Sequence, residues 1–421
     1  MSKDKQPEIR FPGFTDEWEQ RKLGGIGKTY TGLTGKSKED FGHGDAKFVT
    51  YMNVFQNPKA TLEQLENVEI DPRQNEVKKG DVFFTTSSET PEEVGMSSVW
   101  THDINNIYLN SFTFAYRPTI KFDLDYLAFM LRSQSVRKKI IFLAQGISRY
   151  NISKTKMMDI SVPIPVNFGE QQKIGAFFKQ LDDTIALHQR KLDLLKETKK
   201  GFLQKMFPKN GAKVPEIRFP GFTEDWEQRK FFDNIKNTID FRGRTPKKLG
   251  MDWSVSGYLA LSALNVKNGY IDPSVDAHYG NQELYDKWMS GKELYKGQVL
   301  FTTEAPMGNV AQVPDNNKYI LSQRTIAFEL YSDKITDDFL AVLLRSPQSY
   351  NKLLSLASGG TAKGVSQKSL SQFIVTLPKD LDEQQKIGSF FKQLDDTIAL
   401  HQRKLDLLKE MKKGFLQKMF V

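Results

Sequence analysis

Two short loops combine side chains that hold phosphate groups and reach base edges. They are Gly146-Ile-Ser-Arg-Tyr-Asn-Ile-Ser-Lys-Thr-Lys156 and Gly359-Gly-Thr-Ala-Lys-Gly-Val-Ser-Gln-Lys368. Cations, hydroxyls and glycine backbone are the groups that contact a nucleic-acid backbone, and Tyr and Asn can also contact bases. A basic cluster, Arg242-Gly-Arg-Thr-Pro-Lys-Lys248, has the same character. Taken singly, each segment fits a solvated loop equally well. The candidate contacts to nucleic acid are Arg149, Tyr150, Asn151, Lys154, Lys156, Arg242, Arg244, Lys247, Lys248, Lys363 and Lys368.

The overall charge agrees with an acidic partner. The chain of 421 residues has 60 Lys plus Arg against 51 Asp plus Glu, a formal charge of +9. The acidic partner of a basic protein is most often nucleic acid. The alternative is a basic surface that serves only solubility. The absence of cysteine excludes disulfides, thiolate nucleophiles and Cys-ligated metal sites. The N-terminus lacks the apolar core of a signal peptide and no apolar run is long enough to span a membrane, so we expect a cytoplasmic protein.

The sequence contains no recognisable catalytic motif, so no catalytic residue and no metal ligand is predicted. Gly27-Lys-Thr29 and Gly35-Lys-Ser37 end like a P-loop, but Lys22 and Tyr30 occupy the positions that require glycine. The five histidines show no metal-ligand spacing. The chain contains no Pro-Pro dipeptide, which excludes the Asn/Asp-Pro-Pro-aromatic tetrapeptide of amino-methyltransferases.

The elements that carry these loops occur twice in the chain. Residues 7–22 and 215–230 match at 14 of 16 positions, and residues 170–207 and 383–420 match at 36 of 38. The stretches between these markers share only scattered features, such as Gly80-Asp-Val-Phe-Phe-Thr-Thr86 beside Gly297-Gln-Val-Leu-Phe-Thr-Thr303. Identical segments suggest that each copy has the same function. Dissimilar modules in equivalent places suggest the same kind of function directed at different ligands. The alternative is a recent duplication in which the modules drifted freely.

The longer repeat is predicted to be a coiled-coil helix, because its apolar residues alternate at steps of four and three. Asn167 with Glu170, and Asp380 with Glu383, are predicted to form capping boxes, and Pro208 should stop the first helix. Lys199 and Lys412 also fall on the seam. The predicted seam residues are Ile174, Phe178, Leu181, Ile185, His188, Leu192, Leu195, Phe202 and Met206 in the first copy, and Ile387, Phe391, Leu394, Ile398, His401, Leu405, Leu408, Phe415 and Met419 in the second.

We expect the two helices to pair in antiparallel fashion. Each 38-residue segment makes a rod of roughly 57 Å, and the second module must start near the end of one helix and finish at the start of the other. A module of this size has a diameter of about 40 Å, which is too small to bridge the ends of parallel rods.

The modules themselves are predicted to be mixed α/β. Strand-rich runs are expected at 48–55, 81–86 and 107–114, followed by a helical stretch at 126–143. The second module repeats this order at 258–266, 298–303 and 319–330, with a helical stretch at 339–356. Each module then has a polar loop and a short strand that ends in proline.

This layout resembles the specificity (S) subunits of type I restriction-modification systems over essentially the whole chain. The most specific match is the proline-ended strand that leads into a Glu-Gln-x-x-Ile helix, at 160–174 and 373–387. The ending Lys200-Gly-Phe-Leu-Gln-Lys-Met-Phe207 also looks like that of the family. The unusually close identity of the two helices is a departure from the family pattern.

The resemblance implies an α/β (α+β) fold with a pseudo-twofold internal repeat. Two target-recognition domains would alternate with two long helices that form an antiparallel coiled coil. The expected boundaries are 1–166 for recognition domain 1 (module 1), 167–208 for helix 1, 209–213 for a linker, 214–379 for recognition domain 2 (module 2) and 380–421 for helix 2.

The resemblance also implies a non-catalytic subunit that binds double-stranded DNA. It would assemble with two methyltransferase (M) subunits and two restriction/translocase (R) subunits, and not with a membrane. No cofactor is expected on this chain, whereas S-adenosylmethionine, ATP and Mg are expected on the partner subunits. Two unlike modules on a rod should read two unlike half-sites, with centres about one helical turn apart, roughly 10 base pairs. The alternative is a coiled-coil scaffold or protein-interaction module that binds no DNA.

Overall fold

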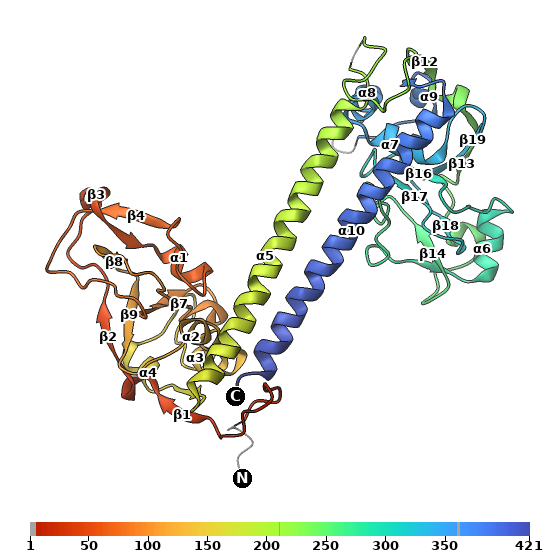
Figure 1. Ribbon diagram of the computed structural model, residues 1–421. Helices are drawn as coiled ribbons and strands as arrows, with labels where there is room; N and C mark the ends of the chain where they lie inside the picture. Colours follow the sequence, from red (N-terminus) through yellow and green to blue (C-terminus); the bar gives the residue numbers. More distant parts are fainter. Residues whose placement is uncertain (1–5, 210, 360–362) are drawn as a thin grey trace. The chain divides into compact units, whose positions relative to one another are not determined.

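The computed structural model describes residues 6–209, 211–359 and 363–421. The chain divides into two compact units, Met1–Gln189 with Arg403–Val421 (unit 1) and Arg190–Gln402 (unit 2). Each unit contains one module, the first part of one long helix and the last part of the other. These helices are α5 (Phe168–Lys205) and α10 (Leu381–Lys418), drawn in yellow-green and blue in Figure 1.

Module 1 is built around an antiparallel four-stranded sheet and a smaller three-stranded sheet. The four-stranded order is β2-β9-β5-β7, with bounds Gly27–Thr31, Thr113–Pro118, Val82–Thr85 and Ser97–Val99. The three-stranded order is β4-β3-β8, with bounds Leu65–Val68, Phe41–Val49 and Ile107–Leu109. Two further antiparallel pairs are β1 with β11 (Glu19–Lys22 and Ser161–Ile164) and β6 with β10 (Ser87–Ser88 and Tyr150–Asn151).

Module 2 repeats this topology although its sequence differs. Its antiparallel four-stranded sheet has the order β13-β19-β16-β17, with bounds Ile235–Asp240, Thr325–Leu330, Val299–Thr302 and Val310–Gln312. Its three-stranded sheet has the order β15-β14-β18, with bounds Tyr279–Gly280, Tyr258–Leu261 and Ile320–Leu321. β12 pairs with β20, at Glu227–Lys230 and Ile374–Leu377. The mixed α/β expectation is thereby confirmed for both modules.

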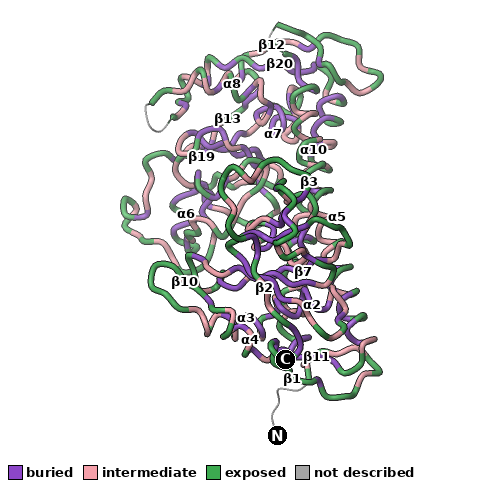
Figure 2. The backbone as a smooth tube through the Cα atoms, turned by 90° about the vertical axis from the view of Figure 1, so that its left-hand side faces the viewer, coloured by how far each residue is buried: buried purple, intermediate pink, exposed green. Residues whose placement is uncertain are grey.

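The few shared residues of the modules form the middle of each four-stranded sheet. All four residues of β5 and all four of β16 are buried, so both strands are covered on both faces. Their largely apolar sequences fit this position, because a strand covered on both faces cannot alternate with polar residues. Gly80 and Gly297 precede these strands with φ of 93° and 88°, a backbone conformation that other residues rarely adopt. In Figure 2, β7 beside β5 and most of β19 beside β16 are purple, which marks buried residues.

Each helical stretch predicted in a module is in fact two helices. The region 126–143 forms α2 (Leu124–Leu131) and α3 (Gln134–Phe142), and 339–356 forms α7 (Asp337–Arg345) and α8 (Pro347–Leu356). In module 2 the break is at Pro347, which cannot continue a helix but is well suited to start one.

Three sequence-based boundaries are wrong for a common reason, an N-cap residue. The strand expected at 48–55 ends at Val49, because Thr50 accepts a hydrogen bond from Asn53 N and starts α1 (Tyr51–Gln56). The polar loop 146–156 ends in α4 (Lys154–Met158), which Ser153 caps in the same way. The polar loop 359–368 likewise ends in α9 (Gln367–Leu370), which Ser366 caps. Module 2 also contains α6 (Gln282–Met289). Short 3-10 turns are η1 Leu23–Gly25, η2 Lys38–Asp40, η3 Pro91–Glu93, η4 Phe231–Asn234 and η5 Lys247–Leu249.

The ends of the long helices lie in the cores of the two units. In unit 1, Phe178 near the start of α5 packs with Phe420, which follows α10, and their ring centroids are 5.7 Å apart. In unit 2, Phe391 near the start of α10 packs with Phe207, which follows α5, at 6.5 Å. In each unit the start of one helix therefore meets the end of the other, which is the antiparallel arrangement that the sequence predicts. Among the residues that the structure describes, no helix is long and apolar enough to cross a membrane.

Candidate nucleic-acid interface

In module 1, the predicted loop 146–156 is anchored to the edge of the fold by backbone pairing. Tyr150 and Asn151 form β10 and pair with Ser88 and Ser87. The Nη2 atom of Arg149 donates to Ser87 Oγ at 3.2 Å, and Arg149 and Asn151 are both exposed. Lys154 Nζ lies 6.0 Å from the centre of the Phe114 ring. The loop therefore presents exposed Arg and Asn side chains from a fixed backbone.

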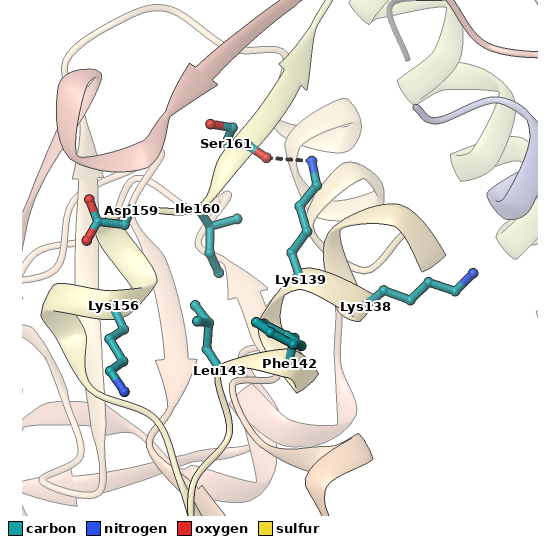
Figure 3. Close-up of a pocket in the computed structure, with 8 residues that line it drawn as sticks. All are labelled: Lys138, Lys139, Phe142, Leu143, Lys156, Asp159, Ile160 and Ser161. Atoms are coloured by element: carbon teal, nitrogen blue, oxygen red, sulfur yellow. Dashed lines mark hydrogen bonds between the residues drawn. The ribbon is translucent and has the colours of Figure 1, made fainter. Parts of the chain in front are cut away.

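Lys156 does not lie beside Arg149 and Asn151. It lines an open pocket of about 550 Å³. Figure 3 shows this pocket with Phe142 and Leu143 beside Lys156, and with Lys139 Nζ donating to the Ser161 carbonyl at 2.8 Å. Phe142 is 87% exposed. Lys156 thus belongs to an apolar pocket with cationic side chains at its edge.

In module 2, two predicted segments that are over a hundred residues apart in sequence meet at Asp240. Arg242 binds Asp240 through Nε at 2.7 Å and through Nη2 at 2.6 Å, and Gln367 Nε2 donates to the same carboxylate at 2.9 Å. Burial opposes ionisation of Asp240, but the hydrogen bonds from Arg242 outweigh it and lower the pKa of that carboxyl. The structure therefore joins the basic cluster to the loop that carries Lys363 and Lys368, which are both exposed. Residues 360–362 of that loop lie outside the described residues.

The other cations of the basic cluster differ in their availability. Arg244 donates to the carbonyl of Trp288 and to Ser290 Oγ, and it lies 4.4 Å above the Phe241 ring. Lys248 Nζ donates to the Gly243 carbonyl at 2.7 Å, whereas Lys247 is simply exposed. Arg244 accordingly holds the loop against the end of α6, Arg242 is bonded to Asp240 with its side chain 41% exposed, and Lys247 faces solvent.

All of the predicted seam residues of α5 and α10 are buried or partly buried. The seam lysines bind acidic residues of the opposite helix: Lys199 Nζ lies 2.5 Å from Asp395 in unit 2, and Lys412 Nζ lies 2.5 Å from Asp182 in unit 1. Burial, and then the charge of Arg345, lower the pKa of Lys199. These two ion pairs are equivalent and fix the same register in both units.

The shorter repeat forms a clamp on the helices that sequence reasoning missed. Arg10 binds Glu170 through two hydrogen bonds of 2.6 and 2.8 Å, and Ile9 N donates to the Lys418 carbonyl at 3.0 Å. In unit 2, Arg218 binds Glu383 with the same two distances, and Ile217 N donates to Lys205 O at 3.0 Å. The identity of the repeats was the available signal, since residues that contact identical helices must themselves stay alike.

The clamp also corrects the predicted capping boxes. Glu170 is 1% exposed and gives both carboxylate oxygens to Arg10, so it does not close a box with Asn167. Asn167 instead caps α5 alone, by accepting from Gly169 N at 2.8 Å. Asp380 does the same for Asp382 N on α10 at 2.8 Å.

Comparison with known proteins agrees with this architecture. The family model described as "Type I restriction modification DNA specificity domain" matches residues 15–197 and 223–410. A relative from Methanocaldococcus jannaschii, assigned as the specificity subunit of the type I restriction enzyme MjaX, is 23% identical and covers 95% of this chain and 92% of its own. A second subunit from that organism, of the type I enzyme MjaVIII, is 24% identical over 67% of each chain.

The fold is shared with a solved structure of a type I S subunit from M. genitalium, at a TM-score of 0.61 and 13% identity over 99% of both chains. The family model matches each module together with most of the long helix that follows it. The two repeats of this chain are therefore two copies of one recognised domain, and the chain belongs to the type I restriction-modification DNA specificity family.

Proposed function

We propose that each module of this non-catalytic specificity subunit reads one half of a bipartite, asymmetric DNA site. The observation that carries the proposal is the contrast between one conserved topology and two different loop surfaces. The sheet order β2-β9-β5-β7 recurs as β13-β19-β16-β17, but the exposed side chains at equivalent places differ. Arg149 and Asn151 in module 1 have as counterparts the lysines of the 363–368 loop in module 2. Unlike donors and acceptors select unlike bases.

We further propose that the two helices set the unread gap between the half-sites and bind two M subunits. Leucines seven residues apart lie on one face of a helix, and Leu187 and Leu194 on α5 are 64% and 61% exposed. Their twins on α10, Leu400 and Leu407, are each 60% exposed. Equal apolar surfaces on near-identical helices support two equivalent docking sites. Two R subunits complete the proposed assembly, with S-adenosylmethionine, ATP and Mg bound by the partners.

The test is methylation sequencing of DNA from cells that express this chain with its M subunit, compared with cells that express the M subunit alone. A bipartite, asymmetric methylated motif that appears only with this chain is the expected result. If no motif appears while the same M subunit methylates DNA beside another S subunit, the proposal is wrong.

A further inference from the structure

The segment Gly35-Lys36-Ser37, which fails as a P-loop, lies in the counterpart of the basic cluster of module 2. It follows β2, the edge strand of the four-stranded sheet, just as the cluster follows the edge strand β13. Each loop has a glycine in the left-handed region, Gly35 at φ 65° and Gly243 at φ 83°. Each then enters a 3-10 turn that starts with a lysine, Lys38 in η2 and Lys247 in η5. The two loops are therefore equivalent in topology, although their sequences are not similar.

The loop after β2 forms one wall of a groove of about 840 Å³, here called the Phe112 groove. Residues that line it include Lys36, Lys38, Tyr51, Met52, Asn110 and Phe112. Phe112 is 67% exposed and Met52 is 48% exposed, so large apolar side chains stand open to solvent beside lysines.

Phe112 is exposed although its backbone is held at both ends. Its N–H donates to Asn110 Oδ1 at 2.9 Å, and its carbonyl accepts from Thr86 Oγ1 at 2.9 Å. Asn110 is itself buried and donates to the Val49 carbonyl at 2.9 Å. An exposed ring on a fixed backbone is prepared for contact with a ligand, because little conformational freedom remains to be lost on binding.

The two lysines of the groove have different roles. Lys36 is only 10% exposed and its Nζ lies 3.3 Å from Asp71, so its charge is used inside module 1 to hold the loop. Lys38 is exposed and makes no ion pair with any residue in the described part of the chain. Lys38 is therefore the lysine of this loop that can meet a phosphate.

Hydrogen bonds through Ser87 link the Phe112 groove to the predicted Arg149 loop. Tyr51 in the groove donates its hydroxyl hydrogen to the Ser87 carbonyl at 2.9 Å, and Arg149 donates to the Ser87 hydroxyl at 3.2 Å. In module 2 the corresponding loops meet directly, because Arg242 and Gln367 both donate to the Asp240 carboxylate. Module 2 therefore bonds the loop after its edge strand to its late polar loop through one carboxylate, whereas in module 1 the groove residue Tyr51 and Ser87 provide the link.

We infer that the Phe112 groove is the base-reading surface of module 1, with Phe112 contacting a base edge and Lys38 a phosphate. An apolar ring recognises a base edge most simply through the methyl group of thymine in the major groove. The inference rests on the proposed function and adds to it the residues by which one module selects its half-site.

The test compares the methylated motifs produced, with the same M subunit, by the unchanged chain, by Phe112→Ala and by Arg242→Ala. Phe112→Ala should relax base preference in one half-site by roughly fivefold at one position and leave the other half and the gap unchanged. Arg242→Ala is the comparison variant in module 2 and should alter only the opposite half. The inference is overturned if Phe112→Ala leaves both halves unchanged, or if the two variants alter the same half. If instead the proposed function is wrong, the unchanged chain itself will produce no methylated motif, so the two failures can be told apart.

A second variant, Lys38→Ala, tests the inference if Phe112→Ala prevents folding. Lys38 is exposed, so its replacement should not disturb the fold. The variant should weaken DNA binding by the assembled methyltransferase equally for all sequences. It should also reduce the slope of log affinity against log salt concentration by about one. An unchanged affinity and slope would overturn the role of the groove in DNA contact.

Discussion

The clamp between Arg10 and Glu170 offers the sharpest test of how module 1 is held to its helix. The Arg10 side chain is 12% exposed and the Glu170 side chain 1% exposed. Replacing Arg10 by Met leaves a buried carboxylate without its partner, which costs about 3–5 kcal/mol. Replacing both residues, in Arg10→Met with Glu170→Leu, removes the charge as well and should recover most of that loss, because an apolar pair of similar volume is often neutral.

Hydrogen exchange measured by mass spectrometry gives the local free energy of opening. In Arg10→Met the amides of residues 168–180 should exchange faster by roughly two to three and a half orders of magnitude, at 1.4 kcal/mol for each factor of ten. The near-identical residues 381–393 belong to unit 2 and serve as an internal control that should not change. Arg218→Met should produce the reverse pattern.

The two units should differ in how well the double replacement restores stability. Trp226 Nε1 donates to Glu383 at 3.3 Å, so Glu383→Leu also leaves that buried N–H without an acceptor. Arg218→Met with Glu383→Leu should therefore recover less than its unit 1 counterpart. The reasoning is refuted if Arg10→Met accelerates exchange by less than tenfold, or if the double variant opens as readily as the single one.

Three further predictions concern pH, docking and spacing. Burial raises the pKa of Asp337 to about 6, so the contribution of this carboxyl to the unfolding free energy of unit 2 should fall as the pH rises from about 4 to 6. Asp337→Asn should remove that fall in urea titrations followed by hydrogen exchange, and an unchanged pH profile would contradict it. Leu187→Glu should reduce the number of bound M subunits from two to one, and adding Leu400→Glu should reduce it to none in native mass spectrometry; full occupancy in the double variant would exclude these leucines as docking sites. A heptad inserted after Gln189 and another after Gln402 lengthens each helix by about 10.5 Å while keeping both Lys–Asp pairs, so methylation sequencing should show a longer gap; an altered half-site would refute this.

The long helices, the central strands and the division into two modules follow from the sequence alone. The 4-3 spacing from Ile174 to Met206 and from Ile387 to Met419 predicts two long helices, because neighbours on a helix face lie three or four residues apart. The strand-rich runs at 81–86 and 298–303 predict the central strands Val82–Thr85 and Val299–Thr302, whose burial on both faces only the structure shows. The repeats, read directly, predict two modules in two equivalent settings.

Tertiary structure alone decided which distant residues meet. Arg10 and Glu170 are 160 residues apart, and Asp240 and Gln367 are 127 apart, so no local pattern links either pair. The same holds for Lys36 and Lys38, whose importance emerges only when β2 and β13 are recognised as equivalent edge strands. Sequence periodicity records what lies next to a residue along one element, whereas a binding surface is made where separate elements converge.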